Sequence, residues 1–245
     1  MRLISGAEFD AYWRSRVVQQ AGSLSGDPVD AVVQGIIAAV RSEGDRALRR
    51  YAASFDRSSP EQLEVDPRLP REAWQELKAG EPALAAALEL AAAHIRRFAL
   101  EQKKQFVDFE YEMEAGLVTG QRVVPVERAA VYAPGGRFPL VSTVLMGLIP
   151  GCVAGVGALV LASPPGVDGL PDRRILAAAG LAGELGGIFP RVFSMGGAQA
   201  IAALACGTET VPRCDLIVGP GNKYVAAAKR LLYGQTGIDF IAGPT

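Results

Sequence analysis

The chain has 245 residues, 49% of them apolar, and its 25 basic residues nearly balance its 26 acidic ones. This length and composition suit one large or two modest domains with a packed core. Because the basic residues are dispersed among acidic ones, the charge pattern argues against nucleic acid as the main partner.

The sequence predicts neither secretion nor insertion into a membrane. The longest apolar stretch, Leu140 to Leu161, is interrupted by Pro150 and several glycines, whereas a bilayer span needs about 20 uninterrupted apolar residues. The first residues contain no apolar signal core. Three cysteines, an odd number without a CxxC pair, favour a reduced, cytoplasmic protein whose thiols are buried and inert.

Helical patterns dominate the first half of the chain. The stretch from Asp30 to Tyr51 repeats apolar residues near the 3.6-residue period and follows Asp27-Pro28, a pair typical of a helix start. Weak alternation around two glycines predicts a β-hairpin before Pro125. In chain order we predict a helix, a short strand, two helices and a hairpin, over residues 30–51, 63–65, 71–80, 82–106 and 109–124.

After Pro125, short β-rich runs alternate with helical patterns, which implies βαβ units and a parallel sheet. The runs are continuously apolar, as in strands buried on both faces. Strands are predicted at 129–132, 158–162, 192–195, 216–218 and 238–242, and helices at 140–149, 172–185, 198–205 and 224–233. We therefore expect an α/β fold: a parallel Rossmann-like βαβ domain over 126–245. A mainly helical region over 1–125 precedes it as part of a second, incomplete and discontinuous α/β domain.

Four of the predicted strands end in turns rich in glycine and proline. In a parallel sheet these turns share one edge, where open α/β sheets bind ligands. Glycine lets backbone N–H groups approach a ligand, and the helix that follows favours phosphate. Three turns place a polar side chain beside a glycine pair: Tyr132, Gln199 and Asn222. Taken one at a time, each turn is better explained as a tight connection between a strand and a helix. Taken together, a shared ligand-binding site and purely structural turns explain the three residues equally well.

Other functional motifs are incomplete in this sequence. Gly155-Val156-Gly157 lacks the third glycine of the dinucleotide fingerprint and precedes a strand, and there is no GxxxxGK[ST]. Ser142, Ser163 and Ser194 have no neighbouring histidine, which disfavours a hydrolase triad. The single histidine, His94, has no second ligand three or four residues away, so we expect it to be structural or solvent-facing rather than metal-bound.

Three stretches of the second half resemble the signature segments of histidinol dehydrogenases. They are VERAAVYAPGGRFPLVSTVLM, VFSMGGAQAIAALACGTETVP and DLIVGPGNKYVAAAKRLLYGQTGIDFIAGPT, in the family's order and spacing. GGAQAIAALA and GPGNKYV together are highly specific. The first half of the chain also resembles the family, but less closely than the second half does.

The resemblance implies an NAD-dependent zinc enzyme of histidine biosynthesis that oxidises L-histidinol to L-histidine through the aldehyde. Tyr132, Gln199 and Asn222 match the family's NAD contacts, and Thr245 falls where the family has a substrate-contacting serine. In the family the zinc ligands and the Glu–His catalytic pair come later in sequence. The resemblance therefore implies a part of a longer, homodimeric enzyme, and a chain that shows no turnover alone.

Two alternatives stay open: a non-catalytic NAD-binding module of the same fold, and an assembly protein whose Gly/Pro turns are purely structural. In the family, the sheet of the first domain is completed by later sequence. We therefore expect the apolar faces of residues 32–40 and 84–98 to be only partly covered. Hydrogen exchange should then be faster in residues 1–110 than in the strands from 129 to 218.

Overall fold

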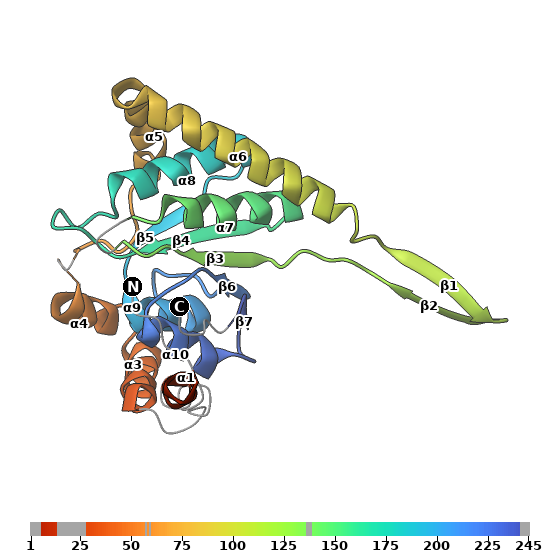
Figure 1. Ribbon diagram of the computed structural model, residues 1–245, viewed down its shortest axis with the longest axis horizontal. Coiled ribbons are helices and arrows are strands. Elements are labelled where there is room, and N and C mark those ends of the chain that lie inside the picture. The colour runs from red at the N-terminus through yellow and green to blue at the C-terminus, as the bar shows by residue number, and fades with distance from the viewer. Residues whose placement is uncertain (1–5, 14–27, 57, 59, 136–138, 241–245) are drawn as a thin grey trace.

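A five-stranded parallel sheet forms the centre of the molecule, and helices cover both of its faces (Figure 1). The computed structural model describes residues 6–13, 28–56, 58, 60–135 and 139–240. In chain order the strands are β3 (Arg128–Tyr132), β4 (Ala158–Ser163), β5 (Arg191–Ser194), β6 (Leu216–Val218) and β7 (Gly237–Ile238). Their spatial order is β5-β4-β3-β6-β7, with every pair parallel. This is the strand order of a Rossmann-like sheet, as predicted.

The helices between the strands alternate between the two faces of the sheet. Helices α7 (Val141–Ala154) and α8 (Arg173–Gly186) pack together on one face, and α9 (Gly197–Cys206) and α10 (Lys223–Leu232) pack together on the other. All four were predicted. The helix α7 continues past Pro150 to Ala154, whereas the sequence predicted an end at Ile149.

A second layer of helices comes from the first half of the chain. On one side α3 (Pro28–Glu43) contacts α9 and α10, and α4 (Asp45–Phe55) contacts α9. On the other side α5 (Leu69–Gly80) packs on α8, and α6 (Pro82–Lys103) packs on α7. A seven-residue helix, α1 (Ala7–Trp13), precedes them. The first half therefore packs on the helices that cover the sheet (Figure 1).

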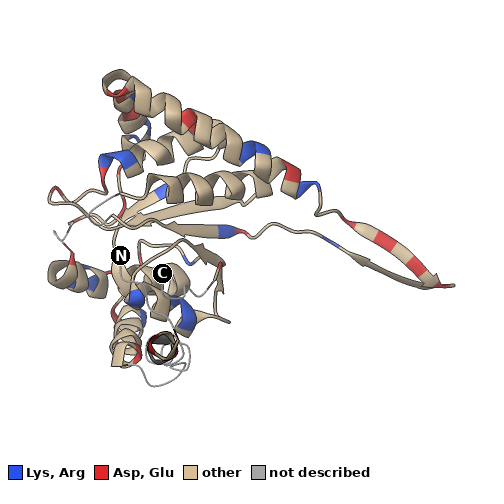
Figure 2. Cartoon of the chain, viewed as in Figure 1, with Lys and Arg blue, Asp and Glu red and all other residues tan. Residues whose placement is uncertain are grey.

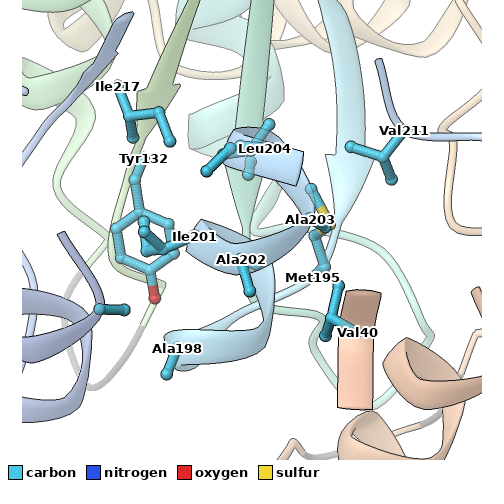
Figure 3. Close-up of a cluster of buried hydrophobic side chains, with 14 of the residues drawn as sticks. Val40, Tyr132, Met195, Ala198, Ile201, Ala202, Ala203, Leu204, Val211 and Ile217 are labelled. Carbon is cyan, nitrogen blue, oxygen red and sulfur yellow. The ribbon is translucent and has the colours of Figure 1, made fainter. Parts of the chain in front are cut away.

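Side chains that alternate along the central strands build two cores. Ala130 and Tyr132 of β3 face the core shared with α3, α9 and α10, and Ala129 and Val131 face the core shared with α5, α7 and α8. Alternation within continuously apolar strands is the pattern expected for a sheet buried on both faces. Figure 3 shows the first of these cores around Tyr132, Ile201 and Ile217.

One expectation for the helices is wrong and a second fails in part. The predicted single helix 30–51 is broken at Gly44, whose φ of 55° lies in the left-handed region that favours glycine. The apolar face of residues 32–40 was expected to be only partly covered: Val32 is 52% exposed, but Val33, Ile36, Ile37 and Val40 are buried because α9 and α10 cover them. The expectation holds better for α6, where Leu90 and Phe98 are 59% and 66% exposed.

The predicted hairpin is present and projects away from the rest of the molecule (Figure 1). Its strands, β1 (Phe109–Glu114) and β2 (Leu117–Gln121), are antiparallel, and all of their residues are exposed. Acidic side chains alternate with apolar ones along β1 (Figure 2). The predicted short strand at 63–65 is a single bridge to β5, where the Val65 N–H donates to the Val192 carbonyl.

The predictions for histidine and cysteine are only partly confirmed. His94 is exposed on α6. Cys214 is buried, and burial raises the pKa of its thiol to about 12, which fits an inert core residue. Cys152 and Cys206 are only partly buried, so the expectation of three buried thiols is wrong for these two. Within the described residues, no helix is long and apolar enough to span a membrane.

Candidate functional site

A cleft of about 360 Å³ lies at the carboxyl edge of the parallel sheet. The chain leaves β3 toward β4 and β5 on one side and later returns to β6 and β7 on the other, so the strand order reverses between β3 and β6. Open α/β sheets bind ligands at this point. The cleft is lined by Val32, Ile36, Phe55, Asp56, Tyr132, Pro164, Gly197, Ala198, Gln199, Asn222 and Tyr224.

The three polar residues singled out by the sequence meet in this cleft. Tyr132 ends β3, Gln199 lies in the first turn of α9, and Asn222 is the N-cap residue of α10. They come from three different strand-to-helix connections. Their convergence therefore depends on the parallel order of the sheet and not on any one turn. The fourth predicted site residue, Thr245, lies outside the described residues.

Tyr132 carries a buried hydroxyl at the base of the cleft. Its ring belongs to the same buried cluster as Ile201 (Figure 3), and its hydroxyl accepts a hydrogen bond from the Gly197 N–H at 3.1 Å. Burial raises the pKa of Tyr132 to about 12, and the nearby charge of Asp56 adds to the increase. The hydroxyl therefore stays protonated at neutral pH and keeps its own hydrogen available for a ligand.

Asn222 fixes the turn between β6 and α10, which lines the cleft. Its Oδ1 accepts hydrogen bonds from the N–H groups of Tyr224 and Val225, as a helix N-cap does. Gly219, in the same turn, has a φ of 115° and lies so close to the Tyr132 carbonyl that a Cβ atom would be 2.1 Å from it. A side chain at Gly219 would therefore displace the turn from the end of β3.

An ion pair between the buried Lys229 and Asp239 also holds the turn in place. Lys229 of α10 is 3% exposed and donates to the Gly219 carbonyl at 2.9 Å and to the Asp239 carboxylate. Asp239 in turn accepts from the Gly219 N–H at 2.7 Å. Because both backbone groups of Gly219 are engaged, the glycine turn has a defined position before any ligand binds.

Gln199 and Asp56 place unsatisfied polar atoms in the cleft wall. Gln199 is 2% exposed, and its Nε2 has no hydrogen-bond partner; Asp56 Oδ2 is likewise buried without one. Burial raises the pKa of Asp56 to about 6, and the nearby Gln199 amide opposes the increase only in part. The amide approaches the carboxylate but does not satisfy it. Buried unpaired groups are costly, so such a pair in a cleft wall points to a ligand.

Several residues of the cleft were not singled out as site residues by the sequence. Asp56 and Phe55 end α4, and Val32 and Ile36 belong to α3, so the first half of the chain forms one wall. Tyr224, beside Asn222, adds an aromatic ring with the Lys223 ammonium 5.3 Å from its centroid. No local pattern marks Asp56, because it reaches the site only through the packing of α4 on α9.

A larger groove of about 710 Å³ lies elsewhere, between α7 and strands β3 and β6. Its lining is almost wholly apolar, and Asp239 is its only charged member among the described residues. Ligand sites combine an apolar surface with a few converging polar groups. The smaller cleft has that character, and the larger groove does not. No group of three metal-ligating side chains occurs within the part of the chain that the structure describes.

A parallel sheet in this strand order, with a cleft at its switch point that contains a few polar side chains, defines a Rossmann-like α/β protein. Comparison with known proteins narrows the class. The family model for histidinol dehydrogenase matches residues 19–245, and the chain belongs to this family.

Similar proteins include histidinol dehydrogenases of several bacteria. The one from Thermus thermophilus is 49% identical over 223 residues, which is 91% of this chain and 50% of the relative. The one from Geobacter sulfurreducens is 43% identical over 99% of this chain and 54% of the relative. A crystal structure of histidinol dehydrogenase from Elizabethkingia anophelis superposes with a TM-score of 0.80 at 32% identity, covering 96% of this chain and 52% of that one. The chain thus spans about half the length of the relatives it matches.

Proposed function

We propose that this chain supplies an NAD-binding part of a histidinol dehydrogenase, which oxidises L-histidinol to L-histidine through the aldehyde in histidine biosynthesis. Family membership supports the reaction, since the family is one of oxidoreductases acting on histidinol. The observation that carries the cofactor assignment is the convergence of Tyr132, Gln199 and Asn222 in the cleft at the switch point. NAD, when bound, supplies the hydride acceptor for each of the two oxidation steps.

The residues of the cleft suit the parts of a dinucleotide. Phe55, Tyr132 and Tyr224 offer aromatic surfaces for a base or nicotinamide ring. The N-terminus of α9, whose N-cap Gly196 carries no capping side chain, favours the pyrophosphate. Gln199 Nε2 and the Tyr132 hydroxyl provide hydrogen-bond donors that fix orientation.

Zinc belongs to the same proposal, but its ligands are assigned to another part of the enzyme. The described His, Cys, Asp and Glu side chains form no donor set that fits zinc, so no step is assigned to a metal held by them. Thr245 stays a predicted substrate contact. We further propose that the complete enzyme is a cytoplasmic homodimer.

Two measurements test the proposal: the first tests NAD binding by this chain, and the second tests whether the chain alone catalyses the reaction. Isothermal titration of NAD should show binding to the 245-residue chain, weakened about tenfold or more by Gln199→Ala. Loss of one hydrogen bond in the cleft accounts for that factor. Glu110→Gln, on the exposed hairpin, is the control and should leave the affinity unchanged. Unaltered NAD binding by the Gln199→Ala variant would refute the assignment.

The second measurement is turnover. With zinc, NAD and histidinol, the 245-residue chain should form no NADH, because its described residues form no metal-ligand group and the family resemblance implies that the acid–base pair comes later in sequence. Zinc-dependent NADH formation by this chain would show that its catalytic groups lie within residues 1–245.

A further inference from the structure

Asp56 places a carboxylate in the wall of the cleft that also contains Tyr132, Gln199 and Asn222. Asp56 caps the end of α4, and its carboxylate lies against the start of α9, where a Cβ on Gly196 would come within 2.9 Å of Oδ1. The carboxylate therefore reaches the cleft wall only because residue 196 has no side chain. Among the described lining residues, Asp56 is the only carboxylate.

The wall around Asp56 offers one unsatisfied acceptor and one unsatisfied donor. Asp56 Oδ2 can accept hydrogen bonds and Gln199 Nε2 can donate them, and neither atom has a partner within hydrogen-bond geometry, although the amide lies near enough to the carboxylate to lower its pKa slightly. A ligand group that satisfies both must donate and accept at neighbouring positions. The two adjacent hydroxyls of a ribose do this, since each hydroxyl donates one hydrogen bond and accepts others.

We propose that Asp56 binds the vicinal diol of a ribose in the dinucleotide, with its carboxylate accepting from the hydroxyls while the Gln199 amide donates to one of them. The inference rests on the proposed NAD-binding function and deepens it. An acidic residue that accepts from the ribose hydroxyls is a recurrent device of dinucleotide-binding folds, where it usually lies about 20 residues after a glycine fingerprint. Here the acid comes from α4, in the first half of the chain.

The charges around the cleft agree with this placement. Partial positive charge at the N-terminus of α9 and the ammonium of Lys223 near Tyr224 suit the pyrophosphate. A carboxylate beside the same anion would repel it, but it suits the neutral ribose. Both unsatisfied atoms are shielded by the cleft walls. Asp56 as a residue is only partly buried and lines the cleft, so its carboxylate lies close to the space that a ligand would occupy.

The test compares the unchanged chain with Asp56→Asn by isothermal titration at pH 8. Asparagine keeps the shape and one acceptor but removes the charge, and charge-assisted hydrogen bonds are about twice as strong as neutral ones. NAD affinity should fall about tenfold in Asp56→Asn and stay unchanged in Glu110→Gln, which removes a carboxylate from the hairpin. Thermal unfolding of each variant confirms that it is folded.

Smaller ligands identify which ribose is bound. AMP and nicotinamide mononucleotide each carry one ribose of NAD, and Asp56→Asn should weaken one of them about tenfold. If AMP is the sensitive ligand, the unchanged chain should also bind NADP at least tenfold more weakly than NAD, because a 2′-phosphate would replace the hydroxyl beside Asp56. If NAD binds the unchanged chain and Asp56→Asn equally, the inference is overturned while the proposed function survives. Absence of NAD binding to the unchanged chain overturns both.

Discussion

Burial of the Asp56 carboxylate raises its pKa from 3.8 to about 6, mainly through the loss of hydration. In the unfolded chain the same carboxyl ionises near its ordinary value. Between about pH 4 and pH 6 the folded chain therefore binds the proton more tightly, and its stability falls as the pH rises through this window. Above pH 6 the ionised carboxylate costs about 1–2 kcal/mol, allowing for the solvent that still reaches this partly exposed side chain.

Asp56→Asn should for this reason stabilise the folded chain at neutral pH. We expect the free energy of unfolding to rise by about 1–2 kcal/mol at pH 7.5, which is several degrees in Tm for a chain of this size. At pH 4 the two proteins should unfold together, because the native carboxyl is then protonated. Thermal unfolding at both pH values checks this. An equal gain at pH 4 and pH 7.5 would show that the effect is not electrostatic.

Single residues of the site differ in how far the sequence reveals them. Tyr132, Gln199 and Asn222 could be predicted because each lies beside glycines in the turn that follows a strand, and a parallel sheet brings such turns to one edge. Asp56 could not be predicted, because its place in the cleft depends on how α4 packs against α9. Propensity and spacing carry no information about that long-range contact.

At the scale of elements, Asp45 joins the start of α4 to the loop that follows α9. Its buried carboxylate accepts from the Thr208 hydroxyl at 2.6 Å and from the Thr210 hydroxyl at 2.9 Å. The Asp45 N–H donates to the Glu209 carboxylate at 2.8 Å. This cluster links two segments far apart in sequence and holds the start of α4 against the loop that follows α9.

Asp45→Ala should destabilise the chain, because both threonine hydroxyls lose a charged acceptor. We expect a loss of about 2–3 kcal/mol in the free energy of unfolding, measured with urea. Glu101→Ala is the matched control. Its carboxylate forms an exposed ion pair with Lys104, and such pairs contribute about 0–1 kcal/mol. Similar losses in the two variants would argue against the Asp45 cluster as a link.

The element boundaries show where sequence patterns fail. The apolar period of the first predicted helix continues from Val40 to Leu48, so it hides the break at Gly44, although both sides of the break contribute to the same core. Pro150 predicted the end of α7, but the helix continues to Ala154. Proline at this position removes one backbone hydrogen bond and disfavours a helix without forbidding it.

At the scale of the whole molecule, the two halves of the chain share their cores. Residues of α3 are buried against α9 and α10, and Trp74 of α5 is buried against α8 and donates to Glu184 at 3.1 Å. The sequence indicated amphipathic helices but not the surfaces on which they pack. Apolar periodicity identifies the buried face of a helix, but it does not identify the element that packs against that face. A division of the chain at residue 125 remains a prediction from composition alone.

This packing changes the expected pattern of hydrogen exchange. Helices α3 and α5 should exchange as slowly as strands β3 and β4, because their buried faces form part of the same cores. Fast exchange should be confined, within the described residues, to the end of α6, the hairpin and the loops. Exchange measured by mass spectrometry gives the comparison. Uniformly fast exchange across α3 and α5 would show that the first half opens independently of the sheet.

The projecting hairpin has a consequence for how the chain responds to a protease. A two-stranded ribbon without a covering layer is marginally stable, and its backbone can open into the extended form that proteases bind. Trypsin should therefore cut first at Lys104 or Arg122, which flank the ribbon. The two pieces should remain associated, because α5 and α6 are packed on α7 and α8. Size-exclusion chromatography of the nicked protein should then give one peak holding both pieces, and separate peaks would contradict this expectation.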